Sequence, residues 1–465
     1  MSQQSDSLVS APSSLQLTSA DLERAAAAGG IRLIVAGQGA VLVTLRHRQT
    51  FEVCFADTES WGAPAVRWRI DRADVTIDFF DCEWRELART DRRQAGFGGR
   101  FPSLETVGTD GSSGEMVPSL DADLGLDLDP TCTYWFSFDH NNRQILYGKG
   151  ELRLSAALVK YVFPTQGERG SSTWMRGVRT VTITPTGIMK TVEVTRDPVC
   201  VDPPLKVISP DVITMEQMAR RTHTVPANLS PECRVLHDNV AGGNFRLDDD
   251  DFPEFSRAIT ASIAAKDGWC RNKLLAKADE FGAHDITTTY LRITLGLNQG
   301  ESPGIPFVME IWPPGHRSPI HNHGGAHAVI KVLHGSIRVF LYRMLSDRVT
   351  EPFMTETFTA GEITWLTPRL NQNHLLQNPL PPGLSVSKDL TIVGEPHDPS
   401  DATVPPPCVT IQCYVYSQGS DQHYPYFDYI QQGGQPFGHF EPNSDMDFLA
   451  FKAKMREEWQ RNAAK

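Results

Sequence analysis

A pair of histidines separated by one residue, His321 and His323, constrains the fold more than any other feature of the sequence. Successive side chains of a β-strand point to opposite faces, so side chains two positions apart lie on the same face. In an extended segment, both imidazoles can therefore reach one metal ion. The pair predicts β-structure around a metal site in which His321 and His323 are ligands.

Glycines at characteristic distances frame this pair. Five residues separate Gly315 from His321, and Gly335 follows His323 further along the chain. This spacing resembles the first motif of the cupin barrels. The glutamate that many cupins place four or five positions after the second histidine is absent, because His327 and Ala328 stand there.

A second group of residues follows the spacing of the other cupin motif: Gly361, Pro368, His374 and Asn378. The resemblance implies a jelly-roll barrel, the double-stranded β-helix, in which His374 supplies a third metal ligand. Three neutral imidazoles would leave a divalent cation with its full charge and with open coordination positions. Such a centre is a variant of the facial arrangement found in non-haem iron oxygenases.

The sequence around these histidines also resembles the cysteine dioxygenases. Family members carry the pattern Trp-x-x-Gly-His-x-Ser-x-Ile-His-x-His-x-x-x-His. The positions of this chain that stand in that register are Trp312, Gly315, His316, Ser318, Ile320, His321, His323 and His327. Upstream, Tyr290 and Arg292 are similar to the family's Tyr-x-Arg, and downstream residues 413–417 are similar to the strand that carries its active-site tyrosine. The resemblance covers residues 286 to 420.

This resemblance implies an oxidoreductase that uses Fe(2+), held by His321, His323 and His374, to add both atoms of dioxygen to a small thiol. The simplest such reaction converts L-cysteine to cysteine sulfinic acid. Arg292 is expected to bind the substrate carboxylate, because a guanidinium is a charged, planar, bidentate donor. Tyr416 is expected to donate a hydrogen bond to dioxygen or to that carboxylate. The other residues expected at the substrate site are Tyr290, Trp312, His327 and Tyr414.

Two departures from the family pattern concern the surroundings of the metal. Many animal members have a cysteine at the position of Ala328, joined to the tyrosine by a thioether, so Tyr416 is expected to be a free phenol here. The family's Ser-x-His-x-Tyr relay reads Gln412-x-Tyr414-x-Tyr416 in this chain. The hydrogen-bonding groups around the centre therefore differ in chemistry, and the identity of the thiol is more open than the reaction type.

The chemistry of the ligands favours the same reaction. A thiolate is a soft ligand that suits a ferrous centre, and an amine beside the thiol could occupy a second coordination position. Dioxygen beside the coordinated sulfur could then oxidise it to a sulfinic acid.

Three alternative functions remain open. The first is dioxygenation of a different or larger thiol. The second is an isomerase or lyase that uses another divalent metal as a Lewis acid. The third is a non-catalytic binding protein, in which the metal is structural and the N-terminal domain recognises a carbohydrate or a protein.

Composition excludes several classes of partner. The 465-residue chain has a net charge of -12 and no basic run, which argues against general nucleic-acid binding. No apolar stretch of about 18 residues predicts a membrane span, and the N-terminal segment does not resemble a signal peptide. A cytoplasmic location is the default expectation. The eight cysteines form no Cys-x-x-Cys pair, so neither a zinc ribbon nor a disulfide framework is predicted.

The length and the pattern of short β-branched runs predict two β-domains. The expected fold class is mainly β, with an N-terminal β-sandwich followed by a cupin barrel and a few helices. The segment from Tyr134 to Glu151 is faintly similar to lectin-like and farnesoic-acid-methyltransferase-like sandwich modules. The expected parts are a mobile segment with a short helix at 1–30, the sandwich at 31–195, a linker or arm at 196–250, the cupin thiol-dioxygenase-like domain at 251–440 and a C-terminal helix at 441–465.

Overall fold

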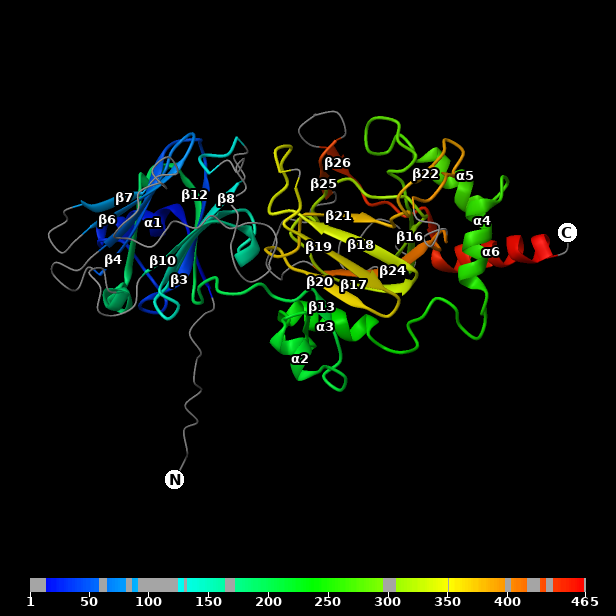
Figure 1. The fold of residues 1–465 in the computed structure, drawn as a ribbon, viewed down its shortest axis with the longest axis horizontal. Helices are drawn as coiled ribbons and strands as arrows, with labels where there is room; N and C mark the ends of the chain where they lie inside the picture. The colour runs from blue at the N-terminus through cyan, green and yellow to red at the C-terminus, as the bar shows by residue number, and fades with distance from the viewer. Residues whose placement is uncertain are drawn as a thin grey trace, which may run out of the picture. The chain divides into compact units, whose positions relative to one another are not determined.

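The structure, a computed structural model, divides the chain into two compact units, Met1–Asp202 and Pro203–Lys465. The residues that it describes are 14–57, 65–80, 86–90, 124–128, 132–163, 172–295, 307–349, 351–397, 403–415, 427–431 and 438–463. Both units are built mainly from β-strands (Figure 1), which confirms the expected fold class. No helix of the described ranges is both long and apolar enough to cross a membrane.

The N-terminal unit consists of two six-stranded antiparallel sheets. The first sheet has the order β1 (Ser14–Leu17), β12 (Met189–Thr195), β3 (Gln38–Leu45), β8 (Thr133–Asp139), β9 (Gln144–Lys149) and β10 (Ala157–Val162). The second has the order β2 (Ile31–Arg32), β11 (Thr180–Thr184), β4 (Phe51–Ala56), β5 (Ala65–Ile70), β6 (Val75–Phe80) and β7 (Glu86–Thr90). The helical segments within its described residues are α1 (Ser19–Ala27) and short 3-10 turns at Leu154–Ala156, Ser172–Gly177 and Thr186–Ile188.

Aromatic side chains join the two sheets into a sandwich. Phe55 of β4 stacks on Phe138 of β8 with ring centroids 5.2 Å apart, and Trp68 of β5 lies 5.9 Å from Tyr147 of β9. All four rings are buried. Because large aromatic side chains bury much apolar area, these cross-sheet contacts form the core of the unit.

The C-terminal unit contains one eight-stranded sheet and a smaller sheet of three strands. The large sheet has the order β14 (His223–Thr224), β13 (Lys206–Val207), β20 (Ile363–Leu366), β17 (His327–His334), β24 (Cys408–Val415), β16 (Phe307–Trp312), β15 (Leu291–Leu295) and β27 (Met446–Asp447). The small sheet has the order β19 (Met354–Thr359), β18 (Ser336–Leu341) and β21 (His374–Gln377). Two hairpins complete the strands: β22 (Leu384–Val386) with β23 (Ile392–Gly394), and β25 (Phe427–Tyr429) with β26 (Gly438–Phe440).

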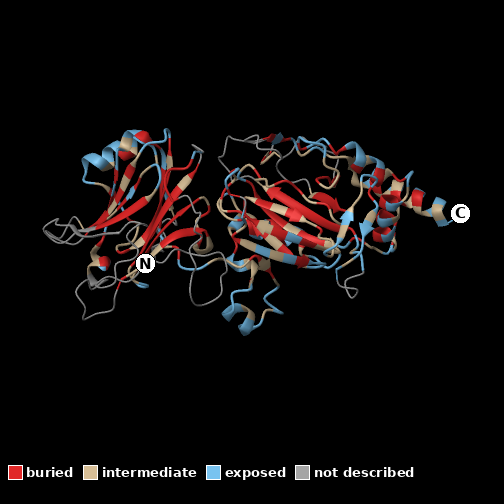
Figure 2. Ribbon diagram, turned by 45° about the horizontal axis from the view of Figure 1, so that its top comes forward, coloured by how far each residue is buried: buried red, intermediate tan, exposed pale blue. Residues whose placement is uncertain are grey.

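Buried residues from both sheets pack together to form the barrel interior. Val332 of β17 and Leu366 of β20 belong to one core cluster with Val339 of β18 and Leu376 of β21. Figure 2 shows that the strands of both units are mainly buried, whereas exposed residues gather on the helices and connecting segments. The C-terminal unit therefore consists of two sheets that share one buried interior, in agreement with the expected mainly β class.

Helices cover the barrel from outside. The segments are α2 (Met215–Ala219), a 3-10 turn at Pro226–Asn228, α3 (Pro231–Val240), α4 (Phe255–Ala264), α5 (Trp269–Ala276) and α6 (Phe448–Ala463). Helix α3 packs on β17 and β24, whereas α5 and α6 contact β15 and α4 packs on both of them (Figure 1). The segment expected as a linker, 196–250, thus supplies β13, β14, α2 and α3 to the C-terminal unit.

The segment before α6 adds the edge strand β27 to the large sheet, next to β15. Strand β27 pairs with β15 in parallel, and the Arg292 backbone amide donates to the Asp445 carboxylate at 2.8 Å. The Asp445 amide donates in turn to the Arg292 carbonyl at 2.7 Å. The far edge of the large sheet is therefore held by residues distant in sequence.

Phe451 should anchor α6. Its ring is fully buried and lies 5.9 Å from Phe255 of α4 and 5.4 Å from Trp269 of α5. Phe451→Ala is expected to lower the free energy of unfolding of the C-terminal unit by about 3–5 kcal/mol, through lost transfer energy and a cavity. Leu449→Ala is the matched control, since Leu449 is 75% exposed and should change stability by less than about 0.5 kcal/mol. Denaturant unfolding measures both, and equal effects would contradict this packing.

Candidate metal centre

The structure brings His321, His323 and His374 together. Their ligand nitrogens all lie within 4.8 Å of one another, and the ring centroids are 4.6–4.9 Å apart. Among the described residues, no other His, Cys, Asp or Glu joins this cluster. His323 and His374 are buried, whereas His321 is partly exposed as a whole residue.

Backbone pairing between two chain segments sets these positions. The amides of His321 and His374 each donate to the carbonyl of the other at 3.0 Å, and Ser318 exchanges hydrogen bonds with Leu376 at 2.9 and 3.0 Å. The Gly315 amide donates to the Asn378 carbonyl at 2.7 Å. Gly315 has a φ of +82°, and a β-carbon there would lie 2.4 Å from the Val386 side chain, so the turn requires glycine. The motif residues around the ligands thus build the scaffold.

Each cluster imidazole has its Nδ1 next to a backbone carbonyl. The distances are 3.1 Å from His321 to Pro319, 3.4 Å from His323 to Gln372 and 3.2 Å from His374 to Asn371. A neutral imidazole that donates from Nδ1 keeps its lone pair on Nε2. The buried Nε2 of His374 has no hydrogen-bond partner in the described structure. This donor set fits a divalent transition metal, because such carbonyl contacts typically orient metal-binding histidines.

Burial keeps the cluster neutral. It lowers the pKa of His321 to about 4 and the pKa values of His323 and His374 well below their ordinary value, because a charged imidazolium is disfavoured away from water. Neighbouring histidines lower the pKa of His323 and His374 further. At neutral pH the imidazoles are therefore in the form that binds a cation.

Aromatic rings form one wall of the cluster. Tyr414 of β24 stacks against His323 with centroids 5.8 Å apart, and Phe427 of β25 lies 4.9 Å from the same imidazole. Tyr290 and Trp312 stack on each other at 4.1 Å, and both are buried. Ala328 of β17 is the registered partner of Tyr414 on β24.

A row of polar side chains runs from this wall across three neighbouring strands. The Tyr414 hydroxyl donates to the Gln412 amide oxygen, and the Gln412 amide nitrogen donates to the Glu310 carboxylate. The other oxygen of Glu310 accepts from the guanidinium of Arg292 on β15. All four side chains are buried. We refer to Arg292, Glu310, Gln412 and Tyr414 as the polar row.

The remaining predicted site residues do not all lie at the histidine cluster. The positive charge of Arg292 contributes to lowering the pKa values of His321 and His323. Its guanidinium is, however, paired with Glu310. His327 is not brought to the cluster: because Ala328 shares a face with Tyr414, the preceding His327 points to the other face of β17, where its Nε2 lies 3.6 Å from Glu232. Tyr416 lies outside the described residues.

Glu310 is the site residue that sequence reasoning missed. It interrupts the apolar strand Phe307-Val308-Met309-Glu310-Ile311-Trp312, and a buried carboxylate in such a strand needs a partner. Its registered partner on β15 is Arg292. The isolated acidic residue was therefore the available signal, although its partner depends on strand register.

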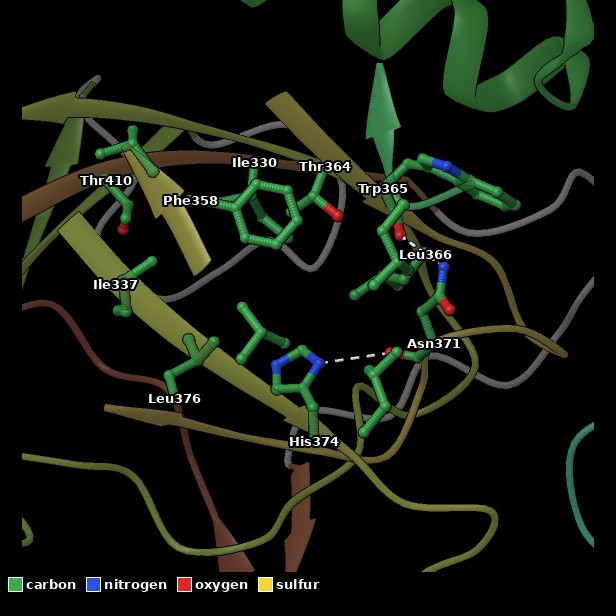
Figure 3. Close-up of a pocket in the computed structure, with 14 residues that line it drawn as sticks. Ile330, Ile337, Phe358, Thr364, Trp365, Leu366, Asn371, His374, Leu376 and Thr410 are labelled. Atoms are coloured by element: carbon green, nitrogen blue, oxygen red, sulfur yellow. Dashed lines mark hydrogen bonds between the residues drawn. The ribbon is translucent and has the colours of Figure 1, made fainter. Parts of the chain in front are cut away.

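A small apolar cavity of about 30 Å³ lies within the barrel beside His374 (Figure 3). Aliphatic and aromatic side chains such as Ile337, Phe358 and Leu376 line it, and Figure 3 shows the His374 imidazole held by Asn371 at its border. A cavity of this size has room for one or a few water molecules and is too small for an amino-acid-sized substrate.

No protein-family model matches the chain. The solved structures similar to it include a single-residue mutant of Bacillus subtilis oxalate decarboxylase (10% identity over 87% of this chain and 70% of that one, TM-score 0.19) and Lactobacillus farciminis oxalate decarboxylase in a formate complex (8%, 82%, 73%, 0.17). Another is L-ribose isomerase of Acinetobacter sp. DL28 in complex with L-ribose (14%, 34%, 74%, 0.18). Likeness of this size carries no argument about family or activity.

Substitution of a cluster histidine should remove bound metal. Protein reconstituted with Fe(2+) is expected to hold close to one ion per chain, whereas His323→Ala should hold little, because two ligands cannot replace three in a facial set. His284→Ala is the control, since His284 is exposed. Elemental analysis after desalting provides the measurement, and full occupancy in His323→Ala would contradict the site.

The protein should lack a tyrosine–cysteine cross-link. Ala328 offers no sulfur for a thioether to Tyr416, so denaturing electrophoresis should show a single form. Peptide mass spectrometry should find the segment with Tyr414 and Tyr416 at its unmodified mass. A loss of two hydrogens in a linked peptide would disprove this.

Proposed function

We propose that this protein is a metal-dependent thiol dioxygenase of the cysteine dioxygenase type. The observation that carries the proposal is the cluster of three neutral imidazoles without a neighbouring carboxylate in the described structure. A divalent cation held by such ligands retains its full positive charge and favours an anionic substrate group. A thiolate is the soft anion that suits Fe(2+).

The overall reaction is RSH + O2 → RSO2H. Two sulfur–oxygen bonds form, the dioxygen bond breaks, and sulfur loses four electrons to dioxygen, so no other reductant is required. When bound, Fe(2+) would supply the site at which thiolate and dioxygen meet and exchange electrons. His321, His323 and His374 would hold it.

The other residues would orient the substrate and limit the access of water. Phe427 and Tyr414 flank His323 and present an apolar wall to the cluster. The Tyr414 hydroxyl donates to Gln412, which fixes the direction of its proton and of the ring. Tyr290 and Trp312 are stacked and buried, so they support the barrel close to this wall rather than forming an open surface.

Oxygen consumption with a panel of small thiols tests this proposal. Protein reconstituted with Fe(2+) should consume one molecule of dioxygen per thiol, and mass spectrometry with ¹⁸O2 should place both labelled atoms in a sulfinic acid. His323→Ala should reduce the rate at least about a hundredfold, because the metal is lost, whereas His284→Ala should retain the full rate. Failure of every thiol to stimulate uptake by iron-loaded protein would reject the proposal.

A further inference from the structure

Arg292 and Glu310 form a buried ion pair within the polar row. Arg292 on β15 and Glu310 on β16 are direct partners in the strand register, and their side chains are 4% and 3% exposed. Both carboxylate oxygens of Glu310 are engaged, one by Arg292 and the other by Gln412. The guanidinium charge is therefore compensated within the protein.

The neighbouring lysines add no unpaired positive charge close to this ion pair. Lys277, a cation close to this pair, lies 3.1 Å from Asp445 and 3.3 Å from Glu280. Lys273 also contacts Asp445, at 3.5 Å, but its side chain is partly exposed to water. The described cations in this part of the unit thus have carboxylate partners of their own. A substrate carboxylate beside this pair would therefore find no free guanidinium or ammonium to bind, and burying it there without a hydrogen-bonding partner of its own would be unfavourable.

One donor of Arg292 is nevertheless unused. Its Nε is buried and has no hydrogen-bond partner in the part of the chain that the structure describes. A buried donor without a partner carries an energetic cost that a ligand acceptor would remove. A neutral carbonyl oxygen satisfies such a donor without adding charge.

We propose that Glu310 neutralises Arg292 so that the site selects an aminothiol whose carboxyl group is masked as an amide and disfavours one with a free carboxylate. This inference rests on the proposed thiol dioxygenase function and names its substrate class. Glu310 acts through Arg292 and is therefore a positioning residue for specificity.

L-cysteinamide and L-cysteine distinguish the two cases, because they differ at the carboxyl group alone. With iron-loaded wild-type protein, kcat/KM for L-cysteinamide should exceed that for L-cysteine at least about tenfold. Anaerobic calorimetry should show the same order in Kd, which provides a readout independent of turnover. Equal or better turnover and binding of L-cysteine would overturn the inference.

Substitutions of Arg292 and Glu310 test whether the charge of Glu310 causes the preference for L-cysteinamide. Glu310→Gln keeps the shape of the side chain but removes its charge, so it should raise the ratio of L-cysteine to L-cysteinamide kcat/KM by about tenfold or more. The double variant Arg292→Gln/Glu310→Gln should lose this gain. Glu362→Gln removes a carboxylate paired with Lys206 on β13, away from the cluster, and should leave the ratio unchanged. An unchanged ratio in a folded, iron-loaded Glu310→Gln protein would also overturn the inference.

The possible failures are distinguishable. If Glu310→Gln does not fold, the wild-type comparison of the two thiols still decides the question. If cysteamine and both cysteine derivatives leave oxygen uptake unchanged, the proposed function itself fails and the inference with it. If L-cysteine is the preferred substrate, the dioxygenase function stands and only the role of Glu310 is wrong.

Discussion

The candidate metal centre depends on the short antiparallel pairing of segments 315–321 and 374–378. Reciprocal backbone hydrogen bonds between His321 and His374 bring ligands from separate parts of the sequence together. Backbone carbonyls then orient the imidazoles through Nδ1. A site held by main-chain bonds is preorganised, so its geometry is less dependent on side chains of variable conformation.

Much of the centre could be predicted from the sequence because it follows from local periodicity. The alternation of strand side chains places His321 and His323 on one face, and glycine spacing identified His374. Relations that depend on register could not be predicted. The pairing of Arg292 with Glu310 requires knowledge of how β15 aligns with β16, and the direction of His327 depends on a difference of one residue along β17. The mainly β class was similarly evident from short alternating runs, whereas strands within 196–250 were obscured by prolines.

The polar row illustrates the cost of buried charge. A buried ion pair adds little net stability, since desolvation offsets the attraction between its members. Loss of one member is more damaging, because it leaves the other charge uncompensated. A sequence that retains Arg292 and Glu310 inside a barrel of otherwise apolar strands therefore gains little stability from them, which is consistent with a role in defining the chemistry of the site.

The hydrogen bonds between Arg292 and Asp445 join residues 153 positions apart in the chain. Contacts of such high sequence separation require closure of a large loop and generally form slowly. His321 and His323 share one short segment and need no such closure relative to each other. The histidine pair and the contact between Arg292 and Asp445 therefore differ in the entropic cost of the loop closure that each requires. Strand β15, which carries Arg292, gains its C-terminal partner only through closure of a far larger loop than the histidine pair requires.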